Sequence, residues 1–129
     1  MQRRVVKRKR FARWQACQRL TDVELCHAIG EMERGLVDAR LGGDLYKKRV
    51  ARPHSGKRDG FRVLISARMP HRAVFLEGFA KSDVGNINND ELLALKHLGQ
   101  VLLNLMPAAF DAAIEQGILL EIECDEQDH

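Results

Sequence analysis

Three strand-like runs follow one another in the middle of this 129-residue chain, and they constrain its fold more than any other feature. They cover residues 44–52, 60–68 and 72–80, and stretches rich in turn-forming residues separate them. The short connection between the last two runs favours an antiparallel hairpin. Helical patterns lie on both sides of the runs, so the sequence predicts an α+β fold in which helices cover a sheet.

Two helices are predicted before the strand-like runs. Residues 11–20 carry Phe11 and Trp14 at helical spacing, and we expect both side chains in the core. A second helix is predicted to begin at Thr21, which has a glutamate three residues further on, and to end near Gly35. Because the turn between them is so short, the two helices are expected to pack as an antiparallel hairpin.

Two more helices are predicted after the runs. Residues 89–105 carry leucines at helical spacing, and Asn88 or Asn89 can cap this helix. Pro107 suits the first turn of a last helix, which a glycine ends. Residues 3–7 and 118–123 are predicted as short flanking strands. A chain of this length is expected to form one domain, residues 1–129.

Charge is distributed unevenly along the chain, whose net charge is +3. Residues 1–72 contain 19 Lys and Arg against 7 Asp and Glu, whereas residues 73–129 contain 2 against 11. Clustered cations release counterions from a phosphate backbone on binding, so the basic part predicts a polyanionic partner. Solvation of the same side chains explains their number equally well.

The sequence predicts a cytoplasmic protein without membrane contact, metal or other cofactor. Its basic N-terminus lacks the apolar segment of a secretory signal, and no apolar run approaches the roughly 20 residues of a membrane span. Cys17, Cys26 and Cys124 are odd in number and form no C-x-x-C pair, so we expect them reduced, with the helical ones in the core. The histidines share no metal-ligand spacing.

Strand alternation is expected to bring three cations to one face of the sheet. Lys47 and Arg49 point to one face of their strand, and Lys48 points to the other. If Phe61 and the apolar residues that alternate with it face the helices, Arg62 joins Lys47 and Arg49 on the solvated face. A bound anion would offset the repulsion among these cations, although a solvated strand tolerates them without a ligand.

The sequence resembles the RelE-like toxins of bacterial type II toxin–antitoxin modules, especially the HigB-like branch. Residues 31–64, 75–96 and 117–123 carry the resemblance, which extends from about residue 3 to residue 123. Its most specific part is the order of a basic strand, a GKxxGxR turn and a strand that ends in GFAK. The resemblance implies a helical hairpin and C-terminal helices on a curved antiparallel sheet, and cleavage of mRNA in the ribosomal decoding site.

The resemblance also implies roles for four residues. Lys47 and Arg49 match the cations that approach the attacking 2′-hydroxyl and the scissile phosphate, and Arg62 matches the arginine that stabilises charge on that phosphate. Lys81 matches the lysine that begins the toxins' basic turn. The general acid is not assigned, because the chain departs from the family pattern after Lys81. The departures are Ser82, Val84 and the loss of a tyrosine near Asn88. Five further residues are candidate RNA contacts: Lys48, Arg52, His54, Lys57 and Arg58.

The partners implied by the resemblance are a cognate helix-turn-helix antitoxin, the ribosome with its mRNA, and operator DNA reached only through the antitoxin. Two alternatives to a ribonuclease stay open. One is a ParE-like toxin that binds a protein target such as gyrase, and the other is a non-catalytic corepressor bound to DNA with its antitoxin. The three clustered cations favour the ribonuclease, because a protein-binding inhibitor has no need of a phosphate-binding cluster.

Overall fold

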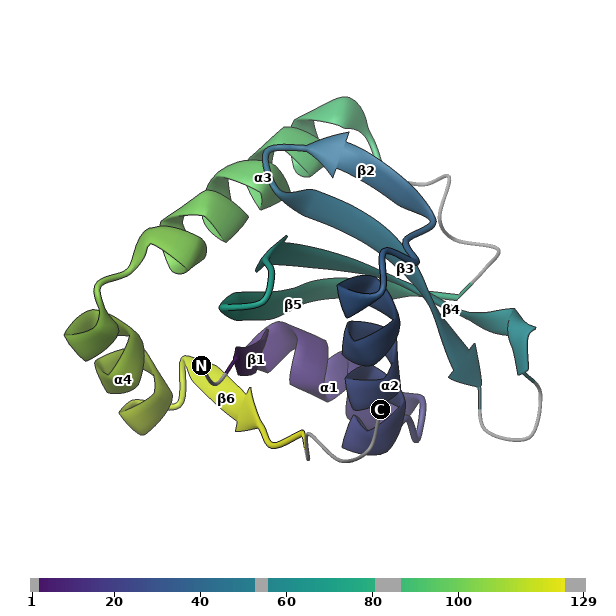
Figure 1. Cartoon of the computed structure of the whole chain (residues 1–129), viewed down its shortest axis with the longest axis horizontal. Coiled ribbons are helices and arrows are strands. Elements are labelled where there is room, and N and C mark those ends of the chain that lie inside the picture. The colour runs from purple at the N-terminus through teal and green to yellow at the C-terminus, as the bar shows by residue number, and fades with distance from the viewer. Residues whose placement is uncertain (1–2, 53–55, 81–86, 125–129) are drawn as a thin grey trace.

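The computed structural model describes residues 3–52, 56–80 and 87–124. Within these residues, six strands form one sheet, and four helices pack on it (Figure 1). The predicted α+β class is therefore confirmed. The strands are β1 (Arg4–Arg8), β2 (Ala39–Gly42), β3 (Leu45–Arg52), β4 (Gly56–Arg68), β5 (Arg72–Phe79) and β6 (Leu119–Ile122). The helices are α1 (Lys9–Cys17), α2 (Asp22–Glu33), α3 (Asn89–Asn104) and α4 (Pro107–Glu115).

The sheet is mixed, with the strand order β2-β3-β4-β5-β1-β6. Strands β1 and β5 pair in parallel, and the other neighbours pair antiparallel. The expectation of an antiparallel sheet is therefore wrong at the β1–β5 pair. The first strand lies between β5 and the last strand, so the direction of its pairing depends on the path of almost the whole chain. Strand β2, which the sequence patterns did not indicate, forms one edge of the sheet.

Helices cover the sheet on both faces. Side chains from α1 and α2 pack on one face, and side chains from α3 and α4 pack on the other. The sheet face of Lys47, Arg49 and Arg62, which we expected to be solvated, is therefore partly covered, because the leucine stripe of α3 packs on apolar residues there. The first cluster includes Phe11, Leu25, Ile29, Phe61, Val63, Ile65 and Phe75. The second includes Leu45, Leu64, Val74, Leu76, Leu102, Leu103 and Phe110.

Helix α3 approaches the sheet closely where Gly99 meets Ser66. A Cβ atom on Gly99 would lie 1.8 Å from the Ser66 Oγ, so a larger residue does not fit there. The end of α3 is held by Arg72, whose Nη1 donates hydrogen bonds of 2.9–3.1 Å to three carbonyl oxygens, those of Leu102, Leu103 and Leu105. The Arg72 guanidinium also lies 3.9 Å from the centre of the Phe110 ring, which joins the end of α3 to α4.

Several predicted helix boundaries are confirmed. Thr21 is the N-cap residue of α2, and Gly35 follows its end with a φ of +86°. The Asn88 side chain caps α3 by accepting a 2.8 Å hydrogen bond from the backbone N–H of Glu91.

No single helix of the described residues is long and apolar enough to cross a membrane. Helices α3 and α4 meet the criteria of length and composition only as a pair, and they are bent by 110°.

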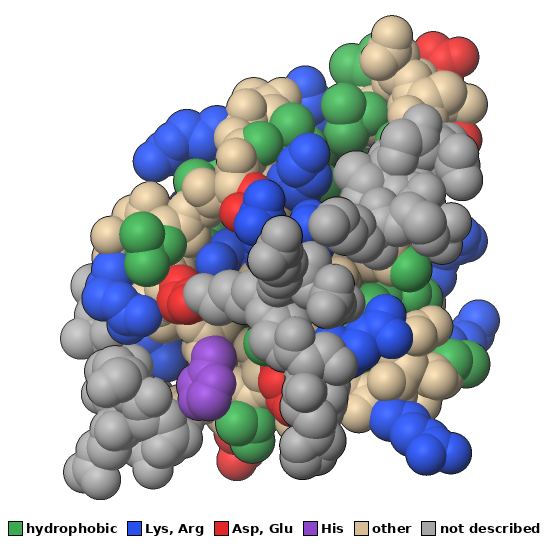
Figure 2. All heavy atoms as spheres, turned by 90° about the vertical axis from the view of Figure 1, so that its right-hand side faces the viewer, with side chains coloured by type: hydrophobic (Ala, Val, Ile, Leu, Met, Phe, Trp, Pro, Cys, Tyr) green, Lys and Arg blue, Asp and Glu red, His purple; other side chains and the backbone are tan. Residues whose placement is uncertain are grey.

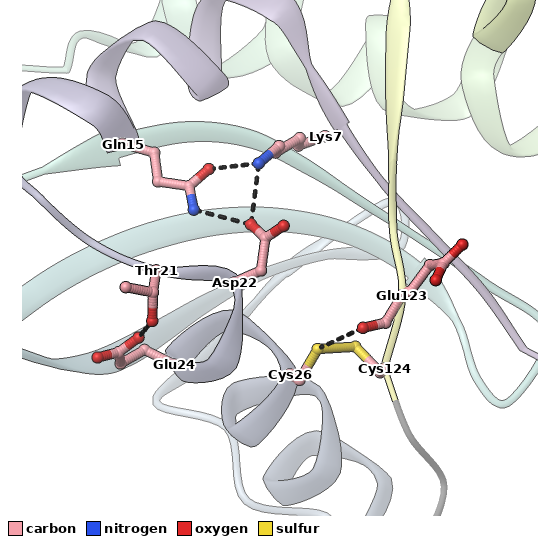
Figure 3. Close-up of polar contacts among 8 residues, drawn as sticks. All are labelled: Lys7, Gln15, Thr21, Asp22, Glu24, Cys26, Glu123 and Cys124. Carbon is pink, nitrogen blue, oxygen red and sulfur yellow. Dashed lines mark hydrogen bonds and ion pairs between the residues drawn. A yellow bond between two sulfur atoms is a disulfide. The ribbon is translucent and has the colours of Figure 1, made fainter.

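A polar network joins β1 to the two N-terminal helices (Figure 3). The Lys7 Nζ donates to the Gln15 Oε1 at 2.7 Å and to the Asp22 Oδ1 at 2.9 Å, and the Gln15 Nε2 donates to the same Asp22 oxygen at 2.8 Å. Burial raises the pKa of the Asp22 carboxyl, but the hydrogen bonds from Gln15 and Lys7 outweigh burial and leave this pKa below its ordinary value.

The expectation that all three cysteines are reduced is wrong. Cys26 on α2 and Cys124 after β6 form a disulfide between residues 98 positions apart in sequence (Figure 3). Cys17 is free, but it is exposed on α1 and is not part of the core. Cys26 packs against the core cluster as expected, and its bond fixes the C-terminal segment to α2.

Candidate nucleic-acid interface

The pairing of β3 with β4 brings three predicted site residues together. Arg49 lies directly opposite Arg62, and Lys47 lies opposite Leu64. Directly opposite residues of an antiparallel pair lie on the same face, and so do residues two apart along a strand. Lys47, Arg49 and Arg62 therefore share one face of the sheet, as strand alternation predicted.

The three cations differ in their surroundings. The Arg49 Nε lies 3.3 Å from the Asp38 Oδ1, and half of the Arg49 side chain is exposed. Arg62, which we expected to be exposed, is only 8% exposed, and its Nη1 donates a 3.3 Å hydrogen bond to the Gly60 carbonyl oxygen. Among the described residues, no carboxylate pairs with Lys47 or Arg62. Within the described residues, the cluster therefore combines three cations with one carboxylate, the Asp38 partner of Arg49.

Arg62 occupies the centre of this arrangement. Its neighbour on β3 is Arg49, and its neighbour on β5 is Phe79. Like charges on directly opposite residues destabilise a sheet, and the cost rises when one of the groups is buried. A phosphate bound between Arg49 and Arg62 would relieve this repulsion, and arginine can bind a phosphate through two parallel hydrogen bonds.

Asp38 is a site residue that the sequence analysis missed. Its carboxylate fixes the Arg49 side chain, and its backbone N–H donates a 3.0 Å hydrogen bond to the Lys47 carbonyl oxygen. Asp38 comes directly before β2, so only the pairing of β2 with β3 brings it beside the cations. Since β2 gave no recognisable pattern, no signal in the sequence linked Asp38 to Arg49.

Lys48 does not belong with the candidate RNA contacts. Its side chain is 4% exposed, and its Nζ forms a 2.9 Å ion pair with the Glu31 Oε1 on α2. Alternation along β3 turns Lys48 towards the helices, and the buried ion pair keeps its ammonium group from any ligand on the opposite face. Arg52 is exposed, and its guanidinium lies 4.5 Å from the centre of the Phe61 ring.

Four other candidates lie wholly or partly outside the described residues. Lys81 and His54 lie outside the described residues. Lys57 and Arg58 fall within β4, which begins at Gly56. The strand predicted for residues 60–68 therefore begins earlier than expected and includes both residues. Their side chains are not among those described.

The side of the molecule where β3 ends and β4 begins is rich in basic side chains. Figure 2 shows the side of the molecule that lies at the right of Figure 1, and Lys and Arg are more prominent on it than Asp and Glu. These basic side chains suit an extended polyanion, whose phosphates they can bind directly.

Among the described residues, no group of three or more His, Cys, Asp and Glu side chains could hold a metal ion.

Comparison with known proteins identifies a protein family that this chain matches. The model of a family described as the RelE toxin of the RelE / RelB toxin–antitoxin system matches residues 3–122. No curated protein sequence matches this chain. The matched range includes every strand and helix described above.

Proposed function

Because this chain belongs to the RelE toxin family and is therefore the toxin of a toxin–antitoxin module with a cognate antitoxin, we propose that it cleaves mRNA on the ribosome. One observation carries the proposal. Arg49 and Arg62 lie directly opposite each other, Lys47 shares their face, and only Arg49 has a carboxylate partner among the described residues. A cluster of this kind matches a phosphodiester that gains negative charge during reaction.

RNA supplies its own nucleophile, the 2′-hydroxyl beside the scissile phosphate. The protein then has to orient the RNA, stabilise charge on the phosphate and assist proton transfer. In the proposed mechanism Lys47 and Arg49 contact the 2′-hydroxyl and the scissile phosphate, and Arg62 stabilises the charge that develops on that phosphate. Asp38 holds the Arg49 side chain in place, and Lys81 remains a candidate from the family resemblance. We also propose that this chain belongs to the HigB-like branch and that it cleaves mRNA that is being translated.

We also propose that the toxin acts in the cytoplasm, because translating ribosomes lie there. Thiols are generally kept reduced in that compartment, so the disulfide between Cys26 and Cys124 would be exposed to reductants.

Cleavage by the purified protein tests the proposal directly. The protein is added to a defined mRNA, once on programmed ribosomes and once as free RNA, and the 5′ ends of the products are mapped by primer extension. We expect cuts in the ribosome-bound message and few or none in the free RNA. Equal cutting of free RNA would contradict dependence on the ribosome. If neither RNA is cut while the protein still arrests growth and inhibits DNA supercoiling by gyrase, the ParE-like alternative replaces the ribonuclease.

A further inference from the structure

The disulfide between Cys26 and Cys124 has no part in the basic cluster. Helix α2, which carries the first cysteine, packs on the sheet face opposite to that of Lys47, Arg49 and Arg62. The second cysteine comes just after β6, and strands β1 and β5 lie between β6 and β4. The bond therefore joins two elements that the proposed ribonuclease does not use, and it needs an explanation of its own.

Helix α2 is fixed to the sheet by contacts that do not depend on the disulfide. Leu25 and Ile29 are fully buried in the first core cluster. Ion pairs also join the helix to the start of the chain and to β3, and they are Lys7–Asp22, Lys48–Glu31 and Arg3–Glu33. Loss of the disulfide should therefore leave α2 in place on the sheet.

The C-terminal strand depends on the disulfide more than α2 does. Strand β6 has only four residues, and within the described part of the chain it pairs with β1 alone. It forms an edge of the sheet, and short edge elements are among the first parts of a protein to open. The bond to Cys26 ties the end of this strand to α2, so its reduction should loosen β6 without displacing the helix.

A hollow of about 450 Å³ gives access to one sulfur of the bond. Residues 3–5 at the start of β1 and residues 121–124 line it. Cys124 therefore belongs to the lining, whereas Cys26 does not. A hollow of this size can admit a small molecule. In thiol–disulfide exchange a thiolate attacks one sulfur and the other sulfur leaves, so this geometry favours attack at Cys124 with Cys26 as the leaving group.

The surroundings of Cys26 suit a thiol as well as a disulfide. Its Sγ lies 3.8 Å from the Glu123 carbonyl oxygen (Figure 3). A sulfur in a disulfide has no proton to donate, but a cysteine thiol is a weak hydrogen-bond donor. A reduced Cys26 thus has an acceptor in place, and a weak hydrogen bond would replace the covalent tie between α2 and the C-terminal segment.

We propose that the Cys26–Cys124 disulfide is an exchange site for low-molecular-weight thiols, which enter through the hollow and attack Cys124. The thiolate of the first thiol bonds to the Cys124 Sγ, the bond between the two cysteines breaks, and the Cys26 Sγ takes up a proton. A second thiolate attacks the sulfur of the first thiol, and the released Cys124 Sγ takes up a proton. Two thiols are thereby oxidised to one disulfide while the protein disulfide is reduced to two thiols. The inference does not rest on ribonuclease activity.

Reduction of the wild-type protein by glutathione tests whether the folded state reacts. Millimolar reduced glutathione is added to the native and to the urea-unfolded protein, and free thiols are alkylated and located by mass spectrometry over time. We expect the native protein to react within about 30-fold of the unfolded rate, because only β6 has to open. A bond that reacts only through global unfolding would be slower by about 1,000-fold or more, and that result would overturn the proposal.

The position of attack is tested with Cys26→Ser and Cys124→Ser, each of which keeps one thiol of the pair. Both variants retain the exposed Cys17 as an internal standard, and thermal unfolding checks that they fold. With oxidised glutathione, Cys124 in the first variant should form a mixed disulfide about tenfold or more faster than Cys26 in the second, each relative to Cys17. Equal rates, or faster reaction at Cys26, would refute entry through the hollow.

Hydrogen–deuterium exchange shows what reduction changes in the wild-type protein. Amides of residues 119–122 should exchange about tenfold or more faster after reduction by glutathione, and amides of residues 25–32 on α2 should change by about twofold or less. Equal acceleration of both segments would mean that the bond holds the whole fold together, and the proposed exchange site would be wrong.

Discussion

Replacing Arg62 with glutamine separates the contribution of this residue to activity from its contribution to folding. Arg62→Gln keeps much of the buried stem and removes the charge of the central cation of the cluster. In the folded protein this charge has one long hydrogen bond, 3.3 Å from the Gly60 carbonyl oxygen, and it lies opposite Arg49. The substitution therefore removes one favourable and one unfavourable interaction at once.

These two interactions nearly balance in the free energy of unfolding. Loss of the hydrogen bond costs about 1 kcal/mol, and relief of a directly opposed like-charge pair returns about 0.2–1 kcal/mol. The net change should be below about 1.5 kcal/mol, which shifts the melting temperature of a domain of this size by about 5 °C or less. The effect on cleavage should be much larger. Removing a group that stabilises charge in the transition state lowers the rate by about 100-fold to 1,000-fold.

The assay is single-turnover cleavage of an mRNA on programmed ribosomes, with thermal unfolding of the same preparations measured in parallel. Arg62→Lys is the control, because it keeps the charge and loses the planar fork of donors. We expect it to cleave faster than Arg62→Gln and slower than the wild type. If Arg62→Gln folds normally and cleaves within about threefold of the wild-type rate, Arg62 does not stabilise the reacting phosphate.

Three further predictions concern the fold. Arg72→Ala should lower the unfolding free energy by about 2–3 kcal/mol in urea titrations, because it frees three carbonyls at the end of α3, while the exposed Arg40→Ala should have little effect. The lowered pKa of Asp22 stabilises the fold above the ordinary value of 3.8, and this contribution disappears as the pH falls below that value, so Asp22→Asn should differ from the wild type less at pH 2 than at pH 7. Alkylation of the native, oxidised protein should modify only Cys17, and Cys26→Ser should cost up to about 4–5 kcal/mol.

Local patterns were sufficient where the structure depends on neighbours in sequence. Alternation along β3 and β4 placed Lys47, Arg49 and Arg62 on one face, and the alignment of Arg49 with Arg62 followed from their pairing. Helical spacing and turn residues also predicted the ends of α2 and the cap of α3 at Asn88. These features depend on backbone geometry that a few adjacent residues determine.

The remaining features depend on contacts between distant segments. Nothing in residues 3–7 indicates that β1 pairs in parallel with β5, because strand direction is not encoded in a short apolar run. Alternation correctly separated Lys48 from Arg49, but only the packing of α2 on β3 reveals that Glu31 buries the Lys48 ammonium. The disulfide likewise joins two elements whose approach no cysteine spacing predicts.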